Sequence, residues 1–169
     1  RELTDPSAKE EWKQIRTAAP QALLLGNLGL SQIIQTPIDV IQGLLESLQA
    51  VGLFIHLNSL QEALQSEGTP QFAGGLAKIE ELCKKISIPI VIKEVGSGFS
   101  QYTLKRLDGI GVFAVDISGY GGTHWGRIEG LRAPPTSVRA QAASSYPHGG
   151  NATEDALSTA GVCNGSEQV

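Results

Sequence analysis

The chain has 169 residues, 41% of them hydrophobic and 18% charged, with a formal net charge of −4 at pH 7. This composition is typical of a globular domain with a core, and its mild acidity disfavours a nucleic-acid partner, which would require clustered Lys and Arg. No apolar run approaches the ~20 residues of a membrane span, and no signal peptide opens the chain, so we expect a cytoplasmic protein without a membrane partner. Cys83 and Cys163 lie far apart without nearby histidines, which predicts neither a disulfide framework nor a zinc site. The chain lacks methionine and begins at Arg1, so we expect a processed or incomplete N-terminus.

Strands and helices are predicted to alternate from residue 22 onward. Four apolar runs have the length of buried strands: residues 22–26, 53–57, 88–95 and 111–118. Helices are expected at residues 36–50, 76–86 and 101–107, and from Trp125 on. The first helix should have Thr36 as its N-cap and Pro37 at N1, and Ser100 should cap the third. This alternation predicts βα units and a parallel sheet.

The composition changes beyond Arg132. Residues 133–169 are rich in Ala, Ser, Pro, Gly and Thr, and they contain few sizeable apolar side chains. Such a segment buries too little apolar surface to offset its ordering entropy, so we expect it to be disordered. The predicted organisation is therefore a folded part, residues 1–132, and a low-complexity tail, residues 133–169.

Polar residues and glycines lie at or just beyond the C-terminal end of every predicted strand. They are Asn27; His56, Asn58, Gln61 and Glu62; Lys93 and Glu94; and Asp116, Ser118, Gly119, Gly121, Gly122 and Thr123. The predicted starts of the strands carry no such groups. Because ligands bind at the carboxyl edge of parallel α/β sheets and barrels, this asymmetry predicts a ligand site there.

Each polar group also has an ordinary structural interpretation. A lone histidine on an apolar strand, such as His56, is more often a hydrogen-bonded core residue than a catalyst. Gln61 and Glu62 could form the solvated first turn of a helix. Lys93 must reach solvent or meet an anion, because a buried unpaired ammonium is costly. The run 121–123, Gly-Gly-Thr, suits a phosphate when a helix follows, although glycine pairs also mark turns.

Four stretches carry a resemblance to a known family. Residues 24–32, 55–68, 89–98 and 115–129 read LLGNLGLSQ, IHLNSLQEALQSEG, PIVIKEVGSG and VDISGYGGTHWGRIE. In this order they resemble the type 2 isopentenyl diphosphate isomerases, the flavin-dependent isomerases of isoprenoid synthesis, over about residues 20 to 132. The resemblance implies a TIM-type (β/α)₈ barrel with FMN at its C-terminal face, of which this chain would supply about four central βα units. It also implies interconversion of isopentenyl and dimethylallyl diphosphate with FMN, Mg²⁺ and NADPH.

The resemblance also implies a role for each polar group. Catalytic positions would be His56 and Gln61, and substrate-binding positions Asn58 and Gln61. Glu62 would hold the Mg²⁺ that binds the substrate diphosphate. Lys93 matches the lysine beside the flavin ring, where its charge can stabilise the reduced flavin. The complete set of expected cofactor-binding positions is Asn27, Lys93, Ser118, Gly121, Gly122 and Thr123.

The resemblance is incomplete at both ends. The family's N-terminal basic segment, its early Thr-Gly-Gly motif and its late glycine-rich strands are missing, and a whole barrel needs ~250 residues. We therefore expect a truncated or out-of-frame chain that is inactive alone and forms homo-oligomers through open sheet edges. Ser59, Ser66 and Gly26 depart from the family pattern, which we interpret as loop adjustments. Two alternatives remain: a non-catalytic partial barrel and, less favoured, an FMN-dependent 2-hydroxy-acid oxidase.

Overall fold

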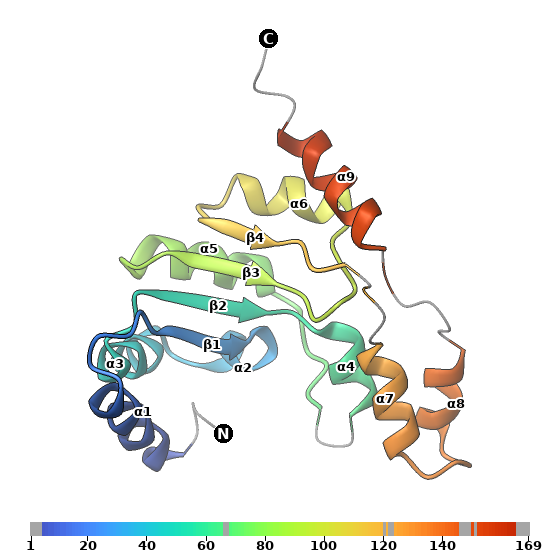
Figure 1. Cartoon of the computed structure of the whole chain (residues 1–169), viewed down its shortest axis with the longest axis horizontal. Coiled ribbons are helices and arrows are strands. Elements are labelled where there is room, and N and C mark those ends of the chain that lie inside the picture. The colour runs from blue at the N-terminus through green and yellow to red at the C-terminus, as the bar shows by residue number, and fades with distance from the viewer. Residues whose placement is uncertain are drawn as a thin grey trace.

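The computed structural model describes residues 5–65, 68–119, 121, 124–145, 150 and 152–164. These residues form an α/β fold around one parallel sheet, with its strands in the order β1-β2-β3-β4 (Figure 1). In chain order, the elements are α1 (Pro6–Ala18), β1 (Leu25–Gly29), α2 (Leu30–Gln35), α3 (Ile38–Leu48), β2 (Gly52–His56), α4 (Ser59–Leu64), α5 (Gly75–Lys85), β3 (Ile90–Lys93), α6 (Gln101–Asp108), β4 (Ala114–Asp116), α7 (Trp125–Arg132), α8 (Val138–Ser144) and α9 (Thr153–Asn164). None of the described helices combines the length and apolarity of a membrane-spanning segment.

The predicted parallel sheet is confirmed, and most predicted elements are found with small shifts. The first predicted strand, residues 22–26, instead lies at Leu25–Gly29, so Asn27 stands inside β1 and does not follow it. One predicted helix, residues 36–50, is instead two helices, because α2 ends at Gln35 and α3 begins at Ile38. Thr36 therefore caps the end of α2, where its Oγ1 donates to the carbonyl of Gln32 at 2.8 Å, and Pro37 stands at the N-cap of α3. The cause is Pro37, which disfavours helical geometry in the residue before it. The predicted Ser100 cap is confirmed, since its Oγ accepts from the amide of Thr103 at 3.2 Å.

One face of the sheet is covered by helices. Two in-register rows of side chains point to this face: Gly26, Leu53 and Ile90, and then Leu28, Ile55, Ile92 and Val115. The first three residues of each row are buried, and the apolar ones pack in one core with residues of α2, α3, α5 and α6. Strands added in sequence order with right-handed connections place their helices on one side of a sheet. The hydrophobic core therefore lies between the sheet and these helices.

The other face of the sheet is open. Its first row, Asn27, Phe54, Val91 and Ala114, is exposed or half-buried. Its second row, at the carboxyl edge, is Gly29, His56, Lys93 and Asp116. Apart from the buried Gly29, the described residues of this face are more exposed than those of the covered face. Of the polar residues singled out from the sequence, Asn27, His56, Lys93 and Asp116 lie on it.

Helix α1 has no counterpart among the predicted elements. Its start has the usual signals, because Asp5 caps it by accepting from the amide of Ser7 and Pro6 follows the cap. Its last turn is tied down by Arg16, whose guanidinium donates to five carbonyls: Leu48, Gln49, Ala19, Pro20 and Ala22. These bonds fix α1 to the end of α3 and to the connection that leads into β1.

Gly26 lies inside β1, so its interpretation as a loop adjustment is wrong. The residue is buried on the covered face of the sheet. A Cβ at this position would come within 2.7 Å of Leu45 Cδ2 and 3.6 Å of the Trp12 ring. Glycine here lets α3 approach the sheet closely. Ser59 is the first residue of α4, whereas Ser66 lies outside the described residues.

Two helices, α8 and α9, lie beyond Arg132, where disorder was expected. Helix α8 is capped by Ser137, which accepts from the amide of Ala140 at 3.1 Å, and it packs on α7 with Ala143 against Gly130. Small residues let two helices approach closely, so this contact buries Ala143 without large apolar side chains. The expected disorder is therefore wrong for these helices, while a domain boundary at residue 132 stays a prediction.

Candidate functional site

The carboxyl edge of the open face brings the predicted site residues together. His56, Lys93 and Asp116 are register partners on β2, β3 and β4, beside Gly29 on β1. Adjacent strands lie ~4.8 Å apart, so these positions form a continuous row. Helices α4, α7 and α8 lie beyond this edge (Figure 1). The predicted gathering of polar strand ends is confirmed, whereas the roles of individual residues stay predictions.

His56 is hydrogen-bonded to a residue of the following turn. Its Nδ1 lies 2.7 Å from Oδ1 of Asn58. Asn58 is 7% exposed and adopts left-handed backbone geometry, φ 30° and ψ 43°, at the N-cap of α4. Asparagine tolerates this geometry better than most residues with a side chain. His56 is therefore a hydrogen-bonded side chain, but it is half-buried on the open face and is not part of the core.

Gln61 contacts a carboxylate that sequence reasoning missed. Its Nε2 lies 3.5 Å from Oε1 of Glu129 on α7, and Nε2 of Gln65 donates to the same oxygen at 3.2 Å. Glu129 is 7% exposed, and Arg132 donates to its two oxygens at 3.1 and 2.9 Å. The i,i+3 spacing of Glu129 and Arg132 is a sequence signal for an ion pair. No sequence feature placed that pair against α4.

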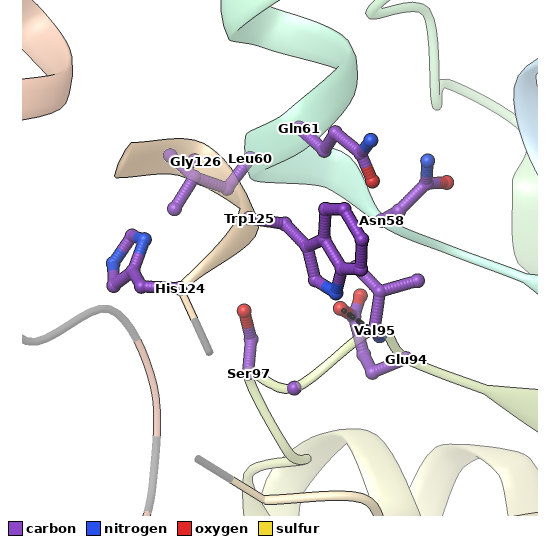
Figure 2. Close-up of a pocket in the computed structure, with 10 residues that line it drawn as sticks. Asn58, Leu60, Gln61, Glu94, Val95, Ser97, His124, Trp125 and Gly126 are labelled. Carbon is purple, nitrogen blue, oxygen red and sulfur yellow. Dashed lines mark hydrogen bonds between the residues drawn. The ribbon is translucent and has the colours of Figure 1, made fainter. Parts of the chain in front are cut away.

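A small cavity lies between α4, α7 and the turn after β3. Figure 2 shows the Trp125 indole between Gln61 and Glu94, with Asn58, Ser97 and His124 around it. The cavity measures about 10 Å³, roughly the room that one water molecule needs. This cavity is too small for a flavin or a diphosphate.

Glu94 is a buried carboxyl at this cavity. It is 7% exposed, and burial raises its pKa above the ordinary value of 4.5. The amide of Val95, which donates to Oε2 at 3.3 Å, and the charge of Lys93 both lower the pKa but do not cancel the effect of burial. A buried carboxylate that is not fully compensated lowers the stability of the folded state.

Replacing Glu94 with glutamine should therefore raise the free energy of unfolding at pH 7. The pKa is higher in the folded than in the unfolded chain, so the wild-type protein loses stability as the pH rises from 4.5 through the folded pKa. Urea unfolding of both proteins at pH 4 and pH 7 measures this loss. The advantage of Glu94→Gln should grow with pH, while Glu10→Gln, at an exposed helical position, should show no such growth. An advantage that does not change between the two pH values would contradict this explanation.

Glu62, the predicted metal ligand, lies in the first turn of α4 but outside this cavity. Its Oε2 accepts from the amide of Thr69 at 2.8 Å. Within the described ranges, no group of three or more His, Cys, Asp or Glu side chains could hold a metal ion. Magnesium typically uses one or two carboxylates together with phosphate oxygens and water. Glu62 therefore belongs to no such group among the described residues, and its role as a Mg²⁺ ligand stays a prediction.

The predicted flavin positions that the structure describes lie at or near the same edge. Asn27 is exposed on the open face, and Lys93 is half-buried with its Nζ 3.5 Å from the carbonyl of Glu94. Ser118 donates from Oγ to Asp116 at 3.1 Å and to the Glu94 carbonyl at 3.4 Å. Gly121 is exposed near Thr153 at the start of α9. Gly122 and Thr123 lie outside the described residues.

The chain is similar to several known proteins, although no model of a protein family matches it. It is 50% identical over 157 residues to a protein of Bdellovibrio bacteriovorus and 48% identical over 169 residues to one of Legionella pneumophila strain Corby. A Methanosarcina barkeri protein is 41% identical over 131 residues. All three are named isopentenyl-diphosphate delta-isomerase.

These isomerases are longer than the chain. The matches cover 93%, 100% and 78% of this chain but 45%, 49% and 36% of the three relatives. The chain thus spans about half the length, or less, of the curated relatives it matches. The match to the Legionella isomerase includes residues 133–169.

Proposed function

We propose that this chain is part of a type 2, FMN-dependent isopentenyl-diphosphate delta-isomerase, which interconverts isopentenyl and dimethylallyl diphosphate. The observation that carries the proposal is the identity of about half of its residues with isomerases of that name. The 157 matched residues are 45% of the Bdellovibrio relative, which is therefore about 350 residues long. That length accommodates the ~250 residues of a complete barrel.

The arrangement of the sheet supports a barrel segment as the fold. Its parallel strands follow one another in sequence order, with their helices on one face and a half-buried apolar row, including Phe54 and Val91, on the other. A doubly wound sheet would reverse its strand order and carry helices on both faces. In a closed barrel the open face would become the interior, and its carboxyl edge would become the mouth of the active site.

The residues on this edge suit a flavin and a diphosphate. Asn27 offers an amide and Lys93 an ammonium on the same face, which are suitable partners for the polar edge of FMN and for its negative charge when reduced. When bound, reduced FMN would supply the acid–base chemistry that a substrate without an acidifying carbonyl requires. Lys93 would stabilise the charge, and Asn27 would orient the ring.

Residues of α4, together with His56 and Asn58 just before it, would bind the substrate and its metal ion. Gln61 is held by Glu129, so its amide has a defined orientation at the mouth. His56 and Asn58 form a hydrogen-bonded pair that can contact the substrate next to Lys93. Glu62 would contribute one carboxylate oxygen to Mg²⁺, with the diphosphate and water completing the shell.

Association between copies of the 169-residue chain also remains a proposal. Leu25 is 48% exposed on the edge strand β1, and Phe113, which precedes the edge strand β4, is 72% exposed. Exposed apolar groups and unpaired strand edges favour contacts with other chains. Nothing in the described residues favours a 2-hydroxy-acid oxidase over the isomerase.

A flavin titration tests the cofactor part of the proposal. The protein encoded by the complete gene should quench the fluorescence of added FMN and retain a flavin absorption spectrum after gel filtration. Absence of flavin binding in that protein would overturn the assignment to type 2, even if the protein isomerised isopentenyl diphosphate with a metal ion alone.

A further inference from the structure

The hydrogen bond between His56 and Asn58 defines which nitrogen of the imidazole carries a proton. The oxygen Oδ1 of Asn58 can only accept, so the Nδ1 of His56 that lies 2.7 Å away must donate. In a neutral imidazole, a proton on Nδ1 leaves Nε2 as an acceptor. We propose that Asn58 is a positioning residue that holds neutral His56 as the Nδ1–H tautomer, with Nε2 presented as a hydrogen-bond acceptor at the carboxyl edge of the open face.

The neighbours of the imidazole ring show from which side a ligand could reach Nε2. The edge of the imidazole that carries Nε2 and Cε1 faces Gly29 of β1, where an added Cβ would lie 3.4 Å from Nε2 and 3.2 Å from Cε1. A side chain at this position would crowd the ring, so glycine leaves room for this edge of the imidazole. The Nε2 atom therefore suits an O–H or N–H donor of a ligand that lies over β1, on the face that also carries Asn27.

The backbone of Asn58 explains why this residue type is suited to the task. With φ at 30° it occupies the left-handed region, which glycine, asparagine and aspartate tolerate best. Of these three, glycine lacks a side-chain acceptor and aspartate has one. Two substitutions therefore separate the fold from the hydrogen bond: Asn58→Gly keeps the backbone geometry without an acceptor, and Asn58→Asp keeps both.

His124 provides an internal control with the opposite tautomer. It stands at the N-cap of α7, where its Nδ1 accepts the amide N–H of Arg127 at 2.9 Å. A nitrogen that accepts from an amide carries no proton, so neutral His124 must be protonated on Nε2. The same protein should thus contain two histidines whose tautomers are set in opposite directions by local hydrogen bonds.

Long-range ¹H–¹⁵N correlation spectra of the imidazole rings test the proposal. The ¹⁵N-labelled protein is measured at about pH 8, where ordinary histidines are neutral, with His148→Gln used to assign the third ring. His56 should show a protonated Nδ1 and an unprotonated Nε2, and His124 the reverse. Asn58→Asp should keep the His56 pattern, whereas Asn58→Gly should shift His56 towards the Nε2–H tautomer and leave His124 unchanged.

The proposal would be overturned by an Nε2–H tautomer of His56 in the wild-type protein. It would equally be overturned by a folded Asn58→Gly variant that retains Nδ1–H. If that variant does not fold, the spectra of the wild type and of Asn58→Asp still show which tautomer His56 adopts. The catalytic meaning of the tautomer rests on the proposed isomerase, but the measurement needs neither flavin nor substrate, so it can fail independently of that function.

Discussion

Replacing Leu53 with alanine should lower the free energy of unfolding of the 169-residue chain by about 3 kcal/mol. Leu53 is 0% exposed on the covered face of β2, so the substitution leaves a cavity between the sheet and its helices. Its neighbour Phe54 points to the open face and is only half-buried. Phe54→Ala should therefore cost about 1 kcal/mol or less in the same chain, although phenylalanine is the larger residue.

Urea unfolding of both variants measures this contrast, and the protein encoded by the complete gene provides the decisive comparison. If the missing part of a barrel covers the open face there, Phe54→Ala should become as costly as Leu53→Ala, about 3 kcal/mol or more. A cost for Phe54→Ala that stays near 1 kcal/mol in the longer protein would count against a barrel. Equal costs in the 169-residue chain would contradict the one-sided sheet.

Replacing Lys93 with methionine in the protein encoded by the complete gene should lower kcat for isomerisation by about 100- to 1000-fold. Methionine keeps most of the length of the side chain but removes the ammonium at the end of β3, next to His56 in the register. A fixed charge close to developing charge in a site that excludes water typically contributes this much. If FMN binds there as proposed, the flavin of the variant should also be harder to reduce, since the negative charge of the reduced flavin would lose its partner.

Lys85 provides the matched control for this substitution. It is an exposed lysine at the end of α5, where it pairs with Glu81 at 2.9 Å, and it lies outside the row of strand ends. Lys85→Met should leave kcat and the flavin potential unchanged. A Lys93→Met enzyme with wild-type turnover and flavin potential would show that the flavin, if bound, lies elsewhere.

The parts of the fold that depend on local pattern could be predicted from the sequence. Apolar runs bounded by turn residues predicted the four described strands, although the first lies at 25–29 and not at 22–26. Their common direction placed His56, Lys93 and Asp116 on one edge, where the register shows them. The Ser100 cap followed from residue type and spacing alone. These features depend on neighbours in the sequence, which is why pattern reasoning reaches them.

The features that were missed depend on contacts between distant segments. Composition alone indicated disorder beyond Arg132, because the close packing of Ala143 on Gly130 needs little apolar surface and leaves no hydrophobic pattern. The burial of Glu129 against Gln61 joins two helices that are 68 positions apart in the chain. The hydrogen bonds of Arg16 to the end of α3 join residues more than 30 positions apart. Such contacts follow from the assembled fold, and local spacing does not reveal them.

The central claim, an isomerase that depends on flavin, is tested most directly by turnover with and without its cofactor. The protein encoded by the complete gene, stripped of flavin and supplied with isopentenyl diphosphate and Mg²⁺, should form no dimethylallyl diphosphate. Adding FMN and NADPH should restore turnover. Isomerisation at an undiminished rate by the flavin-free protein, with the metal ion alone, would contradict the account.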